Sequence, residues 1–109
     1  MKGAQAPRKP AATRRTKASC ASECRQLVQI PNIGPAMAAD FRSLGINSPQ
    51  DLTGCDPLAL YQQLCRSTGQ RHDPCVLDTF MAAIDFMNGA AARDWWSYTA
   101  QRKKQYPDI

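Results

Sequence analysis

The chain has 109 residues, of which 43% are apolar and 21% are charged, and its formal net charge is +5. This length predicts one domain with a modest core, and it is too short for a core plus a deep substrate cleft. The apolar fraction excludes a chain that is disordered throughout, and no run approaches the roughly 20 apolar residues that a membrane span requires.

The positive charge lies at the two ends of the chain. Residues 1–26 carry +6, residues 27–93 carry −2 and residues 94–109 carry +1. The N-terminus lacks the apolar run of a signal peptide, so we expect a cytoplasmic bacterial protein with reduced cysteines. The predicted organisation is a flexible basic tail (1–18), a helical domain (19–104) and a short C-terminal tail (105–109). The basic tail attracts polyanions non-specifically and says little about the domain.

Apolar residues in the domain recur at helical spacing, and no stretch shows the period-two alternation of a strand. A first helix is expected to end before Pro31. A second is expected to begin at Pro35, since proline is favoured at the first helical position, and to end at Gly45. The apolar stripe of the first helix consists of Cys20, Cys24, Leu27 and Val28.

Three further helix starts share one signal, a capping side chain followed by proline. They are Ser48-Pro49, Asp56-Pro57 and Asp73-Pro74. A last helix is expected over residues 91–104; it carries Trp95 and Trp96, which are adjacent and so cannot both face the core. The predicted fold class is all-α, a compact bundle of five or six short helices.

The segment Leu27–Phe41 has the pattern of a helix-hairpin-helix. In its turn, Asn32 and Gly34 tolerate positive φ, and the apolar Ile33 is expected to pack between the helices. The N–H groups of the turn and of the next helix start would then face outward and suit a phosphate oxygen. The predicted contacts to the DNA backbone are Asn32, Ile33, Gly34, Ala36 and the more distant Arg42, and they would read phosphate spacing rather than base sequence.

A degenerate second hairpin is suggested by an internal match. The segment Ile30–Ala36 can be laid over Leu52–Leu58, since each places an apolar residue, a short turn and a proline at a helix start.

Three stretches, LVQIPNIGPAMAADFRSLGI, DLTGCDPLALYQQLC and HDPCVLDTFMAAIDF, resemble the small bacterial helix-hairpin-helix family known as "pathogenicity locus". Some members of that family are called mitomycin-resistance proteins. The resemblance covers about Leu27 to Trp96 and implies a double-hairpin fold and association with DNA, but no catalytic activity. The motif usually reads apolar-Pro-Gly-apolar-Gly with a Lys or Arg after the turn. Here Asn32 replaces the first glycine, and Pro35 to Ala39 hold no basic residue, which weakens phosphate binding.

Three other residues, Cys65, His72 and Cys75, suggest alternative chemistry. With Cys20 or Cys24 they would make a zinc set, although no C-x2-C pair is present. His72 and Cys75 would instead make a thiolate–imidazole pair, with the helix dipole lowering the thiol pKa. Since no third orienting group or second histidine exists, we favour core packing and capping, and we predict no metal, no cofactor and no catalytic residue.

The leading hypothesis is therefore a non-enzymatic module that binds DNA without sequence specificity. The alternative is a protein-interaction module, in which the hairpin is a scaffold and Trp95 or Trp96, or an apolar face, meets a partner. A thiol or metal protein is a third hypothesis. The carboxylates form no acid/base pair: Asp56 and Asp73 are caps, and a solvated face is expected for Asp40, Asp51, Asp78 and Asp85.

Overall fold

The computed structural model describes residues 17–109, and this part of the chain is all-helical, with no strand. The predicted all-α class is confirmed. The described residues form four α-helices, not five or six: α2 (Pro35–Ser43), α3 (Pro57–Thr68), α4 (Pro74–Met87) and α5 (Thr99–Gln105). Four 3-10 helices accompany them: η1 (Ala21–Glu23), η2 (Leu27–Gln29), η3 (Pro49–Leu52) and η4 (Trp95–Tyr98). Within the described part, no helix has the length and apolarity needed to cross a membrane.

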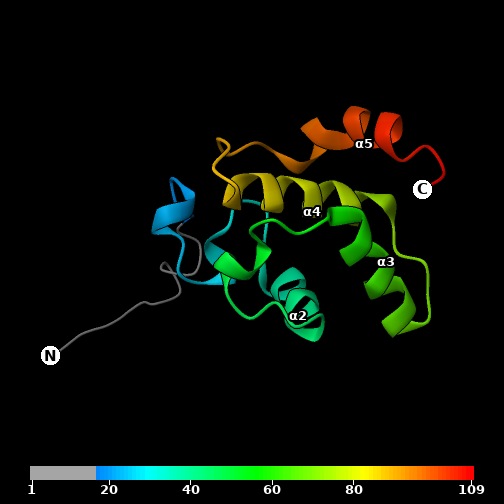
Figure 1. Cartoon of the computed structure of the whole chain (residues 1–109), viewed down its shortest axis with the longest axis horizontal. Helices are drawn as coiled ribbons and strands as arrows, with labels where there is room; N and C mark the ends of the chain where they lie inside the picture. Colours follow the sequence, from blue (N-terminus) through cyan, green and yellow to red (C-terminus); the bar gives the residue numbers. More distant parts are fainter. Residues whose placement is uncertain (1–16) are drawn as a thin grey trace, which may run out of the picture.

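Helix α4 lies at the centre of the fold (Figure 1). Ten of its fourteen residues are buried, which is typical of a helix covered on all sides. It contacts α3, η3, η4 and α5, and the ring of its Phe80 stacks on that of Phe41 in α2, with 4.9 Å between the ring centroids. The core therefore forms around α4, and α2, α3 and α5 are each placed by contact with it.

The helices α3 and α4 begin where the capping signals predict. The carboxylate of Asp56 accepts the N–H of Leu58 at 3.1 Å, and that of Asp73 accepts the N–H of Cys75 at 2.8 Å. The bond to Cys75 holds the pKa of Asp73 below its usual range. A proline follows each cap at a position where its missing N–H costs no helical hydrogen bond.

The predicted first helix is instead two 3-10 turns, η1 and η2. The side-chain oxygen of Gln29 accepts the N–H groups of Arg25 and Gln26, at 2.8 and 2.9 Å, and so starts a new turn where a continuous helix would run on. Cys20 is exposed, which breaks the predicted apolar stripe. Pro31 still ends the segment, because it disfavours helical backbone at the residue before it.

Two other predicted helices are shorter than expected. The one after Ser48-Pro49 is only η3, which Asp51 caps by accepting the N–H groups of Asn47 and Ser48, at 3.0 and 3.1 Å. The chain then turns at Gly54, where φ is 78°. The helix predicted over residues 91–104 begins late, because residues 91–94 are not helical and η4 and α5 follow them.

A buried ion pair joins α5 to α4. The carboxylate oxygens of Asp78 accept from Arg102 Nε and Thr99 Oγ1, each at 2.8 Å, and the Asp78 side chain is only 1% exposed. The prediction that Asp78 lies on a solvated face is therefore wrong. Asp78 belongs to α4, which is covered on all sides, so its carboxylate is buried. The cation that pairs with it, Arg102, lies 24 residues further along the chain. In the predicted C-terminal tail, Tyr106 and Ile109 pack against the core.

Candidate functional site

Two segments repeat one backbone arrangement, in which a 3-10 turn, a tight turn and a proline-initiated α-helix follow one another. We call them the first unit (η2 to α2, residues 27–43) and the second unit (η3 to α3, residues 49–68). Each turn has one residue in the left-handed region, Asn32 at φ 75° and Gly54 at φ 78°. The internal match in the sequence is thus a repeat of structure. In both units a 3-10 turn, and not an α-helix, precedes the tight turn, so the structure does not show the helix-hairpin-helix predicted for Leu27–Phe41.

The same hydrogen bond closes both turns. The N–H of Ile33 donates to the Ile30 oxygen at 3.1 Å, and the N–H of Cys55 donates to the Leu52 oxygen at 3.0 Å. Ile33 is fully buried, which confirms its predicted packing. Gly34 does not use the positive φ that glycine tolerates. Its φ is −96°, because the turn is already complete and the chain enters α2 through an extended residue.

The two units differ at the residue before the proline. In the second unit, the carboxylate of Asp56 accepts the N–H of Leu58 and places its negative charge at the helix N-terminus. In the first unit the equivalent residue is Gly34, which has no side chain to place there. Among the described residues, no acceptor takes the N–H groups of Gly34, Ala36 or Met37. The first unit therefore leaves open a helix end that the second unit closes.

The residues predicted to contact phosphate are only partly brought together. The backbone N–H groups of Gly34 and Ala36 lie at the open helix end, whereas that of Ile33 is used inside the turn. Arg42 is exposed in the last turn of α2, about 12 Å along the helix axis from Gly34. The open end thus has backbone donors without the basic side chain that was expected to accompany them.

The side chain of Asn32 fastens the first unit to a distant segment. Its amide group donates to the Arg93 oxygen at 2.8 Å, and its oxygen accepts the N–H of Trp95 at 3.3 Å. The side chain of Asn32 thus holds the turn against residues 93–95, and the predicted contact of Asn32 with DNA stays a prediction. The left-handed backbone predicted for Asn32 is confirmed.

Lys17 lies against the first unit, although the sequence places it in the tail. Its ammonium group donates to the backbone oxygens of Val28, Ile30 and Ile33 at 2.8, 3.2 and 2.8 Å. Partial burial lowers the pKa of Lys17. Sequence analysis missed this residue because the contacts span 11 to 16 positions and a lysine in a basic tail has no distinguishing pattern.

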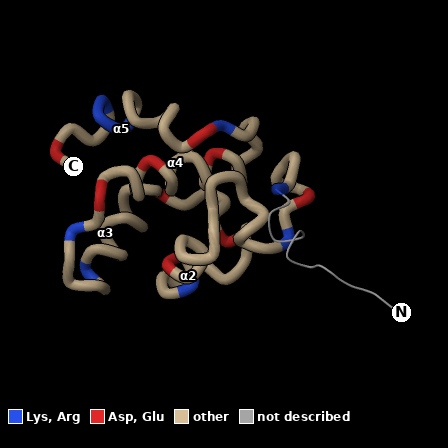
Figure 2. Tube along the Cα trace, turned by 180° about the vertical axis from the view of Figure 1, so that it is seen from behind, with Lys and Arg blue, Asp and Glu red and all other residues tan. Residues whose placement is uncertain are grey.

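Charge is balanced over the part of the chain that the structure describes. Residues 17–109 hold nine Lys and Arg and nine Asp and Glu, so the whole net charge of +5 belongs to residues 1–16. Figure 2 shows the two signs interspersed along the trace rather than gathered on one face. An anion would therefore be held at the first unit by local donors and not by a broad positive field.

An open pocket of about 350 Å³ adjoins the turn of the first unit. Its lining consists of Lys17, Pro31, Asn32, Ala92, Arg93 and Asp94. The Arg93 guanidinium lies over the ring of Tyr98, 4.3 Å from its centroid, and this cation–π contact holds the positive charge close to the domain. Two cationic side chains thus lie beside the turn, partly offset by Asp94.

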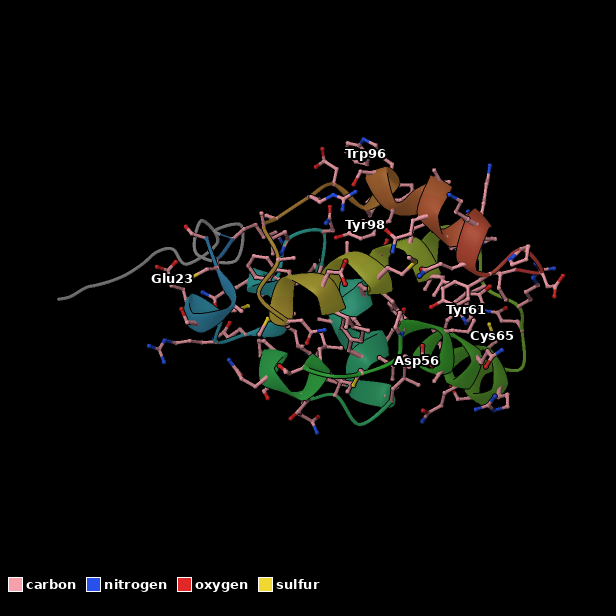
Figure 3. The ribbon with its side chains drawn as sticks, turned by 45° about the horizontal axis from the view of Figure 1, so that its top comes forward. Glu23, Asp56, Tyr61, Cys65, Trp96 and Tyr98 are labelled. Atoms are coloured by element: carbon pink, nitrogen blue, oxygen red, sulfur yellow. The ribbon has the colours of Figure 1, made fainter. Side chains whose placement is uncertain are left out.

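The two adjacent tryptophans face different ways, as predicted. Trp95 packs partly against the core. Trp96 is 59% exposed and projects away from the domain (Figure 3). Among the described residues it is the large apolar side chain that solvent reaches most freely, which makes it a candidate contact for a partner.

The residues considered for thiol or metal chemistry are not arranged for either. His72 Nε2 forms a hydrogen bond with Thr68 Oγ1 at 2.8 Å, and the His72 N–H donates to Cys65 Sγ on α3 at 3.5 Å. Burial and the neighbouring Asp73 raise the pKa of Cys75, opposite to the expected lowering. Within residues 17–109, no three His, Cys, Asp or Glu side chains lie close enough to hold a metal ion.

Comparison with known proteins identifies the family of the chain. The family model described as "pathogenicity locus" matches residues 20–104, which include both units. The chain belongs to this family. The mitomycin resistance protein McrB of Streptomyces lavendulae is 41% identical over 83 residues, covering 76% of this chain and 79% of the relative. No solved structure matches the chain. The resemblance seen in the sequence is thereby confirmed as family membership.

Proposed function

We propose that the protein is a non-enzymatic module whose first unit acts as a reduced helix-hairpin-helix and binds DNA phosphates without regard to base sequence. The open helix end carries this proposal. Three N–H groups, those of Gly34, Ala36 and Met37, lack acceptors among the described residues. Backbone donors at the positive end of a helix dipole suit a phosphate oxygen and carry no base specificity.

The second unit supports this assignment by contrast. It has the same turn and the same proline, yet Asp56 occupies its helix N-terminus. A phosphate there would displace a carboxylate from its hydrogen bond and meet a negative charge. The first unit is therefore the better site, and the two units need not act alike.

The basic tail has a separate role in this proposal. The described domain is neutral, so long-range attraction to DNA comes from the five basic residues within residues 1–16. Each phosphate that a lysine or arginine neutralises adds about 0.9 to the slope of log affinity against log salt. We assign the attraction to the tail and the positioning of the phosphate backbone to the first unit.

Gly34→Asp tests the open helix end. A Cβ at Gly34 meets no atom within 4 Å, so the fold accommodates a side chain there. Aspartate would cap α2 as Asp56 caps α3 and would repel a phosphate. Because a hydrogen bond to a charged group contributes about 1.5–3 kcal/mol, we expect at least a roughly tenfold loss of affinity for a labelled DNA duplex, measured by fluorescence anisotropy at low salt.

Three variants of the full chain serve as controls. Gly34→Ser caps the helix without a charge and should weaken binding less than Gly34→Asp. Asp56→Gly removes the carboxylate that closes the second unit and should not weaken DNA binding. Replacing the five basic residues within residues 1–16 with glutamine removes the general attraction; the remaining binding should disappear on adding Gly34→Asp. If the tail-neutralised protein does not bind DNA at low salt, the first unit is not a DNA site.

A protein-interaction module is the second candidate function, and the exposure of Trp96 favours it. An exposed tryptophan is a common anchor of protein interfaces. If a second copy of the chain is the partner, sedimentation of the full-length protein should show concentration-dependent association that Trp96→Ala removes. A monomer over the whole concentration range counts against this form of the hypothesis.

A further inference from the structure

We propose that Lys17 is a positioning residue for the first unit: it holds the turn so that the N–H of Gly34 faces the DNA phosphate, without touching the phosphate itself. This inference rests on the proposed function, since the open helix end is the site being positioned.

The ammonium group of Lys17 is fully used within the protein. An ammonium has three N–H donors and no acceptor. The three backbone oxygens that it meets, on Val28, Ile30 and Ile33, lie at 2.8, 3.2 and 2.8 Å. No donor is left for a phosphate. Lys17 therefore acts on the site through the turn and not by direct contact.

The orientation of one peptide group transmits this effect. The Ile33 oxygen and the Gly34 nitrogen belong to the same peptide, and in a trans peptide the C=O and N–H bonds point in nearly opposite directions. Because Lys17 draws the Ile33 oxygen to one side of the turn, the N–H of Gly34 is directed to the other side. The positive charge on the oxygen also polarises that N–H and makes it a stronger donor.

Lys17 also fixes where the tail joins the domain. The N–H of the next residue, Ala18, donates to the Gln29 oxygen at 2.9 Å, so both residues are bound to η2 and its turn. The chain that carries the net positive charge, residues 1–16, is thus connected beside the first unit. One lysine therefore links the general attraction for DNA with the local phosphate site.

The test compares Lys17→Met with Lys103→Met in the full-length protein. Lys103 is an exposed lysine on α5, so its replacement removes the same charge elsewhere on the domain. We expect Lys17→Met to weaken binding of a labelled duplex roughly tenfold at every salt concentration, since a charge-assisted contact at Gly34 is misdirected. The slope of log affinity against log salt concentration should stay unchanged, whereas the loss of a direct phosphate contact would lower its magnitude by about 0.9. Lys103→Met should change affinity little.

Lys17→Arg provides a second variant that keeps the charge. The three backbone oxygens surround the single nitrogen of the lysine ammonium, and the N–H groups of a planar guanidinium cannot all be directed at them. We therefore expect Lys17→Arg to have intermediate affinity with the wild-type slope. If Lys17→Met lowers the slope by about 0.9, Lys17 contacts phosphate directly and the proposal is wrong. Unchanged affinity in Lys17→Met also overturns it.

A DNA-free measurement separates this inference from the proposed function. In the free protein, Lys17→Met should shift the amide NMR resonances of Gly34 and Ile33 while resonances of α4 stay in place. If wild-type protein fails to bind DNA yet these shifts occur, the proposed function fails and the orienting role of Lys17 stands. If the Gly34 resonance does not move, Lys17 does not orient the turn.

Discussion

The ion pair between α4 and α5 offers a direct test of how the last helix is held. Replacing Arg102 with methionine keeps most of the apolar length of the side chain and removes the charge. Asp78, which is 1% exposed, would then keep only the bond from the Thr99 hydroxyl. A carboxylate left in this environment without its cation is strongly destabilising.

The magnitude follows from the burial of both partners. The two side chains are 9% and 1% exposed and their atoms are 2.8 Å apart, so solvent screens the pair little. Breaking a buried pair by removing one partner costs about 3–5 kcal/mol. Since a domain of this size is stable by about 5–15 kcal/mol, the variant should lose a large fraction of its stability. Its melting temperature should fall by roughly 15 °C or more.

Urea denaturation followed by tryptophan fluorescence measures this loss. The double variant Asp78→Leu/Arg102→Met replaces the pair with apolar side chains and should recover most of the stability, because no unpaired charge remains. If Arg102→Met alone loses less than about 1 kcal/mol, α5 is held by its apolar contacts and the ion pair is not what docks it.

Three shorter predictions concern side chains that fasten or cap elements. Asn32→Ala should lower the free energy of unfolding in urea by about 2–3 kcal/mol, and Asn32→Gly by about 1 kcal/mol less, since only alanine is strained at φ 75°. Backbone bonds hold the pKa values of Asp51 and Asp73 below their unfolded values, so their contribution is present near neutral pH and lost as acid protonates them. The free energy of unfolding should therefore fall below about pH 4, and it should fall less in the double variant Asp51→Asn/Asp73→Asn. A free energy of unfolding that stays constant down to about pH 3 would contradict the capping role. Because its pKa is raised, Cys75 should react with iodoacetamide more slowly than the exposed Cys20, as peptide mapping can show.

Local signals predicted the parts of the fold that local contacts control. Asp56-Pro57 and Asp73-Pro74 each place a cap and a proline side by side, and α3 and α4 begin there. Apolar spacing before Pro31 predicted one helix, but the side chain of Gln29 captures two N–H groups and divides the segment. Hydrophobic periodicity cannot reveal a side chain that accepts these N–H groups in place of the helical backbone.

The sequence predicted the part of the candidate site that the backbone forms, but not the part that side chains form. The tight turn and the helix start at Pro35 followed from residue types that set φ. The roles of Lys17 and Asn32 could not be predicted, since each depends on a partner that the fold brings close from 11 or more positions away. Asp78 was misassigned for the same reason, because its cation lies one helix further along the chain.

The link from Asn32 to residues 93–95 makes the timing of folding unusual. These hydrogen bonds bridge more than half of the chain, so the turn of the first unit cannot take its final shape until the segment ahead of η4 has docked. Contacts so distant in sequence form slowly, because closing the intervening loop costs entropy before the contact stabilises anything. In a chain made from its N-terminus, the first unit is thus among the earliest parts synthesised and among the last to mature.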